Sequence, residues 1–242
     1  MTTGAEPWSP IPPGASGPQI ATRPAVELGE GHNRGMRDFP LPAAEFYREL
    51  EEDNSREFWL ANKHRYDTEV RGPLVEVVAA LAEEFGEAKV FRPHKDVRFS
   101  KDKAPYKTHQ GAYVAMAPAC GFYVEVNAEE AFAGGGFYRA EPDALARFRA
   151  AIDDERSGRQ CQGLVEGLEA DGWLIVGDAL RTAPRGFPRT HPRIGLLRHR
   201  SLTAMREVTA TGVEAFAEQV REIWRGSAPL VDWLAARLDD RS

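Results

Sequence analysis

The stretch Phe122-Tyr123-Val124-Glu125-Val126-Asn127, in the middle of the chain, alternates with a period of two. Such alternation is typical of a β-strand, because successive side chains of a strand point to opposite faces of its sheet. Residues 111–116 predict an antiparallel partner strand across a turn at 118–121, and residues 131–138 predict a third strand, interrupted by the glycines at 134–136. The centre of the chain therefore predicts an antiparallel meander.

Helical patterns precede this meander. The clearest is an amphipathic helix ended by Gly86, whose apolar stripe consists of Leu74, Val77, Val78, Leu81 and Phe85. An earlier helix is expected over residues 43–50. The stretch Asn54-Ser55-Arg56-Glu57 has the form of a capping box, which predicts Asn54 as the N-cap of a helix over residues 55–66.

Helical patterns also follow the meander. Pro142 suits the first position of a helix, and the apolar residues of that helix are Leu145, Phe148 and Ile152. A less regular stretch comes next, with short strands expected near 173–176 and 202–209, and helix is expected again from about Gly212, with Pro229 within it. This order predicts an α+β fold, with a central antiparallel sheet flanked by N-terminal and C-terminal helices.

Residues 1–36 are rich in Pro and Gly and have no apolar period, so we expect a disordered tail, with Met36 as a candidate native start. Residues 37–242 are expected to form a single α+β domain. No segment approaches the roughly 18 apolar residues of a membrane helix, and no signal peptide is evident. Cys120 and Cys161 are isolated, which argues against a disulfide framework or a cysteine zinc site. We therefore expect a cytoplasmic protein without a membrane partner, of open oligomeric state.

The net charge of −6 conceals two basic blocks. Residues 92–109 hold six lysines and arginines against two aspartates, and residues 179–206 hold seven arginines and no acidic residue. Localised positive charge on an acidic protein favours an anionic partner. Pairing of these blocks with acidic surface of the same chain is the alternative, and the sequence leaves both readings open.

Lysine is scarce in this chain and is clustered. Arginines number 25 and lysines only six, yet four of the six lysines lie within thirteen residues: Lys95, Lys101, Lys103 and Lys107. Positions that need only a positive charge have mostly been filled by Arg. A clustered Lys therefore indicates a need for a compact ammonium, or for an amine whose pKa can shift when it is buried. Chance clustering in a solvated loop is the alternative.

The segment 92–109 mixes cations, carboxylates, a phenol and imidazoles, a combination that can bind phosphate or carboxylate and transfer a proton. We expect Asp96 to act as a base or orienting group, and Lys103 or Tyr106 to act as a proton donor. The ligand-binding residues expected with them are Arg98, Lys101, Lys107, His109, Lys63 and Arg56. In a purely structural account, the two aspartates would brace the loop by pairing with its cations, and Tyr106 would pack. No cofactor is indicated, and the histidine spacings assign no metal ligands.

The run Asp96-Val97-Arg98-Phe99, then Asp102-Lys103-Ala104-Pro105-Tyr106-Lys107, forms a specific motif. Three passages accompany it: Asn54-Ser55-Arg56-Glu57-Phe58 with Asn62-Lys63 and Tyr66, the glycines at 134–136, and Ala183-Pro184-Arg185-Gly186-Phe187 with His191-Pro192. Together these passages resemble a family of conserved hypothetical proteins, domain of unknown function 2461, over about residues 38–238. Lys95 departs from the family, which usually has Arg there; the charge is kept but the guanidinium fork is lost. The resemblance supports the domain limits and the choice of motif, and implies no activity, substrate or cofactor.

Two function classes follow. The first is binding of an anionic small molecule that carries phosphate or carboxylate, with enzymatic activity left open. The second is a non-catalytic module that docks an acidic protein or nucleic acid through its basic face. Nucleic acid is the weaker partner, because the arginine block has no interleaved aromatic residue except Phe187. The glycines at 134–136 lack the lysine and helix spacing of a phosphate-binding P-loop, which favours a bulge or close packing at that point.

Overall fold

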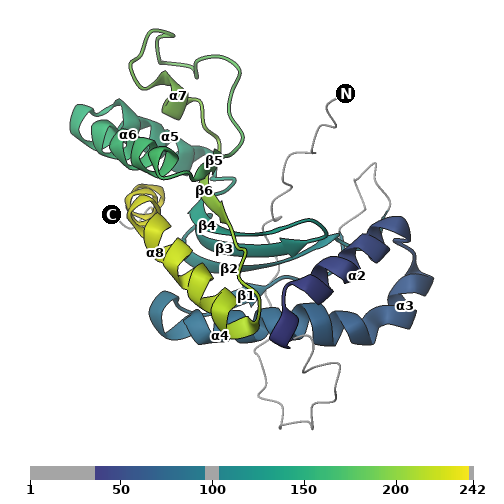
Figure 1. Cartoon of the computed structure of the whole chain (residues 1–242). Coiled ribbons are helices and arrows are strands. Elements are labelled where there is room, and N and C mark those ends of the chain that lie inside the picture. Colours follow the sequence, from purple (N-terminus) through teal and green to yellow (C-terminus); the bar gives the residue numbers. More distant parts are fainter. Residues whose placement is uncertain (1–35, 96–103, 240–242) are drawn as a thin grey trace.

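The computed structural model of the chain describes residues 36–95 and 104–239, and within these ranges it is an α+β structure (Figure 1). Six strands form one antiparallel sheet in the spatial order β1-β2-β3-β4-β6-β5. The strands are β1 (Ala88–Val90), β2 (His109–Ala117), β3 (Cys120–Asn127), β4 (Ala131–Phe137), β5 (Leu174–Val176) and β6 (Leu202–Glu207). The predicted meander β2-β3-β4 is confirmed, and β1 and the β6-β5 pair extend it on either side.

Helices come before, within and after the strands of this sheet. The N-terminal ones are α2 (Leu41–Glu52), α3 (Arg56–Arg65) and α4 (Gly72–Phe85), and a π-helical segment, η1 (Tyr66–Arg71), joins α3 to α4. The later ones are α5 (Pro142–Asp153), α6 (Glu155–Ala170), α7 (Ile194–Leu197) and α8 (Val213–Leu238). The predicted fold class, a central antiparallel sheet flanked by N-terminal and C-terminal helices, is therefore confirmed. None of the described helices combines the length and apolar character needed to cross a bilayer.

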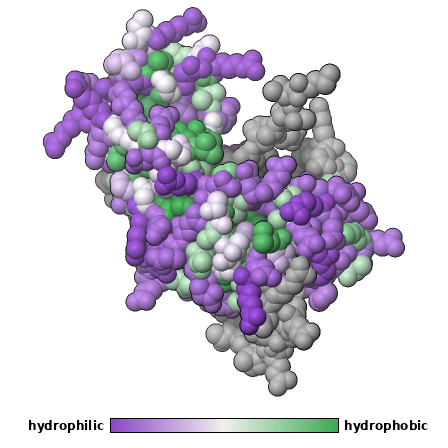
Figure 2. Space-filling model, in the orientation of Figure 1, coloured by the Kyte–Doolittle hydropathy of each residue, from purple (hydrophilic) through white to green (hydrophobic). Residues whose placement is uncertain are grey.

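The helices α2, α4 and α8 pack on one face of the sheet, where the large core lies (Figure 1). Phe122, Val124 and Val126 of β3 point into this core. The alternate residues of β3 point to the opposite face, where Tyr123 belongs to a second, smaller cluster. In the described part of the chain, that cluster holds no helical residue and consists of Phe91, Tyr123, Met205, Tyr113 and Phe132. The surface drawn in Figure 2 is mostly hydrophilic, with small separate hydrophobic patches.

The glycines at 134–136 do not interrupt β4, contrary to the expectation from the sequence. Each of the three pairs with β3 on one side and β6 on the other. A Cβ at Gly135 would lie 2.5 Å from Val231 Cγ2 of α8, and a Cβ at Gly134 would lie 2.0 Å from the Ala204 carbonyl oxygen. Close packing, the reading favoured from the sequence together with a bulge, accounts for these glycines.

Two other expectations were wrong. Asn54 is not the N-cap of α3; Ser55 is, because its Oγ accepts a hydrogen bond of 3.1 Å from the Phe58 amide. The stretch after Ile152, expected to be less regular, forms α6 over sixteen residues. Small residues conceal the period of α6, since Gly158 and Cys161 occupy buried positions that large apolar side chains usually mark.

Candidate functional site

The two ends of the basic segment pair with each other. The Lys95 amide donates to the Pro105 carbonyl at 2.9 Å, and the Lys107 amide donates to the Pro93 carbonyl at 2.8 Å. His94 lies opposite Tyr106 in this short antiparallel pairing. Four of the residues that the sequence singled out lie between the two ends, outside the described residues: Asp96, Arg98, Lys101 and Lys103. The described part of the site is therefore built on residues 91–95 and 104–109.

Tyr106, a predicted proton donor, points toward the helices. Its ring stacks on the Trp59 indole of α3, with centroids 4.2 Å apart and ring planes 11° apart. Asn54 holds the same residue through its backbone, because Asn54 Nδ2 donates to the Tyr106 carbonyl and Asn54 Oδ1 accepts from the Tyr106 amide, each at 3.1 Å. Tyr106 is buried, and its described contacts fix the position of the strand.

A second buried contact holds the start of β2 on the same side. The Tyr66 hydroxyl donates to Gln110 Oε1 at 2.6 Å, and Gln110 Nε2 donates to the Phe91 carbonyl at 2.8 Å. Both side chains are buried, so these hydrogen bonds form away from water. They join η1, the segment after β1 and the first residues of β2 into one support.

Lys107 and His109 lie on the opposite face, where their neighbours are Phe91 and Glu125. Lys107 Nζ lies over the Phe91 ring, 5.3 Å from its centroid. His109 Nε2 lies 3.9 Å from Glu125 Oε2. The Tyr123 hydroxyl donates a hydrogen bond to the same carboxylate, which is only 8% exposed. A buried carboxylate, an imidazole and an ammonium are thus gathered on the face that carries no described helix.

Gly111 makes this arrangement possible. It pairs with Glu125 across the β2–β3 ladder, two residues after His109. A Cβ at this position would lie 2.3 Å from the Tyr123 hydroxyl oxygen. The absence of a side chain therefore lets the Tyr123 ring lie over β2 and reach the Glu125 carboxylate.

The electrostatics of this group are governed by burial and by neighbouring cations. Burial lowers the pKa of Lys107, and the positive charge of Arg92 lowers it further, against the attraction of Glu125. Burial also lowers the pKa of His109; Glu125 acts in the opposite direction, and the charges of Lys107 and Lys95 add to the lowering. We call these four basic residues, Arg92, Lys95, Lys107 and His109, the basic corner. Cations held close together in partly buried positions disfavour one another's charged forms.

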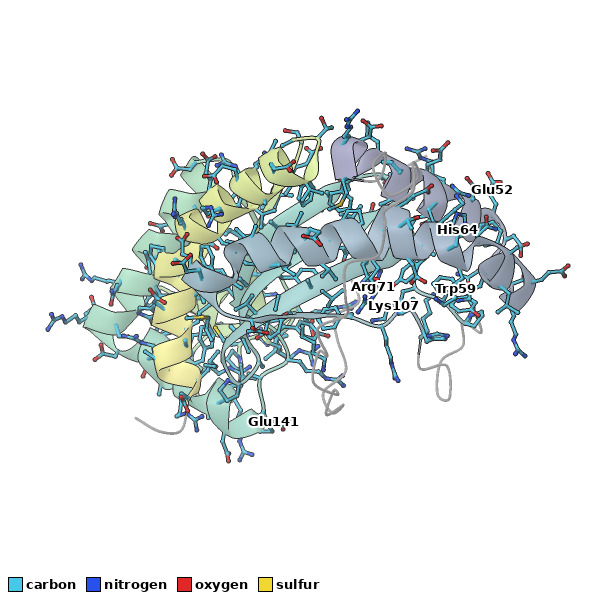
Figure 3. All side chains as sticks on the ribbon, turned by 90° about the horizontal axis from the view of Figure 1, so that it is seen from below. Glu52, Trp59, His64, Arg71, Lys107 and Glu141 are labelled. Carbon is cyan, nitrogen blue, oxygen red and sulfur yellow. The ribbon has the colours of Figure 1, made fainter. Side chains whose placement is uncertain are left out.

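The structure places two predicted ligand residues elsewhere. Arg56 and Lys63 are exposed on α3, and Lys63 Nζ forms an ion pair of 2.5 Å with Asp67. No hydrogen bond or ion pair among the described residues joins either of them to Lys107 or His109. Figure 3 shows Lys107 nearer the middle of the molecule than Trp59, with Glu141, the residue before α5, apart from both.

The sequence reasoning did not assign Glu125, Tyr123 or Arg92 to the site. Glu125 stands at a polar position of the alternating stretch, a position that normally faces solvent. Only the register of β2 against β3 places it beside His109. In the sequence, the role of Glu125 is indicated only by its position two residues after Tyr123, which places both side chains on the same face of a strand. No group of three or more potential metal-ligating side chains occurs in residues 36–95 and 104–239.

A model of the family of conserved hypothetical proteins DUF2461 matches residues 42–233. The chain belongs to this family. The match includes every described residue of the basic corner together with Glu125 and Tyr123. Neither a curated protein nor a solved structure matched the chain.

Proposed function

We propose that this chain binds an anionic small molecule, carrying a phosphate or a carboxylate, at the basic corner. The observation that supports the proposal most directly is that basic side chains gather on one face of the sheet, with Lys107 over the Phe91 ring and His109 beside Glu125. Lys107 and His109 are two residues apart on one face of the chain, and each has a pKa lowered by burial and by a further cation. A bound anion would reverse this repulsion and favour the charged form of both groups.

The arrangement around Glu125 supports a role in proton transfer. A neutral His109 can accept a proton at pH 7, and the Glu125 carboxylate 3.9 Å away can stabilise the imidazolium that results. The Tyr123 hydroxyl holds that carboxylate through its hydrogen bond. An anion bound by Lys107 would lie within reach of this base, so an enzyme at this site would use His109 as the base, Glu125 to orient it and Lys107 to bind the ligand.

Binding can be tested by thermal unfolding and by NMR. Phosphate and sulfate should raise the melting temperature of the wild-type protein and should shift the imidazole resonances of His109. Lys107→Met keeps the apolar stem over Phe91 but removes the charge, and should abolish both responses. Arg159→Met is the matched control, since it removes an exposed cation from α6, and should leave them intact. A wild-type protein with neither response to these anions contradicts the proposal.

A second candidate function rests on a different observation. The loop over residues 177–193 exposes Arg181, Arg185 and Arg189, and no ion pair of these side chains occurs among the described residues. Two other arginines fix the loop from within. Arg198 donates to the Leu180 and Arg181 carbonyls, and buried Arg193 donates to the Ile152 and Asp153 carbonyls. We propose as the alternative that this ordered loop docks an acidic protein or nucleic acid.

This alternative predicts salt-sensitive binding of polyanions. Fluorescence polarisation with labelled poly-glutamate and with labelled duplex DNA would measure it at low and moderate salt. Replacing Arg181, Arg185 and Arg189 together by Gln should remove the binding, whereas Lys107→Met should leave it. Binding that persists in the triple variant contradicts a role for the loop.

A further inference from the structure

A cavity of about 580 Å³ lies at the edge of the sheet where β6 extends beyond the first residue of β5. Leu174, the first residue of β5, pairs with Met205, so the next two residues of β6 have no strand beside them on that edge. The shortness of β5 thus opens a space between β6 and α8. Phe132, Leu174 and Ile223 supply its apolar wall. Leu174 is 53% exposed.

The cavity also has an acidic side. Glu130, Glu207 and Glu222 line it. Burial raises the pKa of Glu130, and the negative charges of Glu129, Glu207 and Glu125 raise it further. Arg206 lines the cavity as well, but its guanidinium donates to the Asp171 carbonyl at 2.7 Å and lies over the Trp173 ring. Neighbouring negative charges therefore disfavour the charged form of Glu130, as neighbouring cations disfavour the charged form of His109.

The cavity and the basic corner are linked by one row of residues across the sheet. Gly111 pairs with Glu125, Glu125 pairs with Phe132, and Phe132 pairs with Glu207. His109 lies two residues from the first member of this row, and Phe132 and Glu207 line the cavity at its other end. Three strand spacings of about 4.8 Å separate the ends of the row, which makes roughly 14 Å.

We propose that this cavity receives a cationic end of the same ligand whose anionic end binds the basic corner. The ligand is then a molecule with a phosphate or carboxylate at one end, an ammonium at the other and an apolar segment between them. This inference rests on the proposed function and adds the class of ligand to it. Carboxylates at the far end of the row would repel a second anionic group, so a ligand with one anionic end is selected over one with two.

The probes are two matched series, linear alkyl phosphates and ω-aminoalkyl phosphates with two to twelve methylene groups. Isothermal titration calorimetry measures the Kd of each. We expect the amine to leave Kd unchanged for the shortest chains, which cannot reach the cavity, and to lower it about tenfold for chains long enough to span the row. This lowering of Kd by the amine should require the carboxylates that line the cavity.

A double variant, Glu130→Gln with Glu207→Gln, tests that requirement. Both side chains are exposed, so the fold should persist, and circular dichroism checks this. The double variant should lose the advantage of the amine while binding alkyl phosphates as the wild type does. Glu76→Gln, which removes an exposed carboxylate from α4, is the control and should retain the advantage.

The possible failures are distinguishable. Equal affinity for the two series at every length, or an advantage that survives in the double variant, overturns the inference and leaves the proposed anion site standing. Failure of both series to bind overturns the proposed function and the inference together.

Discussion

The Tyr106 ring stacks on the Trp59 indole at 4.2 Å, and this contact fastens the basic segment to α3. Trp59 also packs against Tyr66 at 4.8 Å and against Phe46 at 6.1 Å, so it belongs to the main core as well. One side of the segment 104–109, which carries the site, is therefore anchored in the core. Lys107 and His109, on the other side, are held in place as a consequence.

Removing the indole should weaken this anchor. Trp59→Ala should lower the free energy of unfolding by about 3–5 kcal/mol, since it deletes a large buried side chain together with the stack. Urea denaturation measures the loss, and Trp59→Phe should lose less because an aromatic face remains. Leu60→Ala is the control: Leu60 is exposed beside Trp59, and the change should stay within about 0.5 kcal/mol. A loss below about 1 kcal/mol for Trp59→Ala would contradict the anchoring role.

Asn54 also holds the segment 104–109, through two hydrogen bonds to the backbone of Tyr106. Asn54→Ala removes the partner of both Tyr106 backbone groups and should cost about 1–3 kcal/mol in urea denaturation. Asn62→Ala serves for comparison, because Nδ2 of the Asn62 side chain donates to the Phe58 carbonyl, and both residues belong to α3. Equal effects of the two substitutions would show that the hydrogen bonds between Asn54 and Tyr106 add nothing to stability.

Gly111 should not tolerate even a methyl group. Gly111→Ala places a Cβ against the Tyr123 hydroxyl and should lower the free energy of unfolding by about 1–3 kcal/mol through overpacking. Gly163→Ala in α6 is the matched control, because nothing beyond its chain neighbours and the backbone of its own helix lies within 4 Å of the added Cβ. That change should stabilise the helix by about 0.5–1 kcal/mol. Thermal or urea unfolding checks both signs, and a neutral Gly111→Ala would contradict the close approach of Tyr123.

His109 should make stability depend on pH. Its pKa in the folded protein lies below the ordinary 6.5, so the unfolded chain binds the proton more readily. The stabilisation is present above pH 6.5 and is lost as the pH falls through the folded pKa. His199 shifts in the same direction through burial and contributes likewise. Urea titrations between pH 8 and 5 should therefore show a decline that His109→Asn makes shallower; an unchanged slope would contradict the lowered pKa.

Anion binding should follow the opposite course with pH. A protonated His109 adds a charge to the basic corner, so sulfate should raise the melting temperature more at pH 5.5 than at pH 8. Sulfate is the suitable probe because its own charge does not change in this range. The difference should vanish in His109→Asn. A sulfate effect independent of pH would place the anion away from His109.

The sequence alone predicted the α+β class, the strands of the meander and the apolar stripe of α4. Leu74, Val77 and Leu81 repeat at the helical spacing and are buried, as expected. These features could be predicted because they depend on local periodicity. The helix α6 was not predicted, because the small residues Gly158 and Cys161 occupy buried positions in it. A hydrophobic period marks a helix only where large apolar residues fill its buried positions. Ser55, rather than Asn54, caps α3 because Asn54 is engaged by Tyr106, which is distant in sequence.

For the candidate site, the sequence by itself determined the clustering of lysines and histidines in one segment, and with it the basic character of Lys107 and His109. Only the tertiary structure decided which groups act together. Strand register placed Glu125 beside His109, the missing side chain of Gly111 gave Tyr123 room to reach that carboxylate, and Trp59 turned Tyr106 toward the core. The physical reason is that charge belongs to each residue, whereas burial and neighbours set its pKa and its partners, and both depend on segments far apart along the chain.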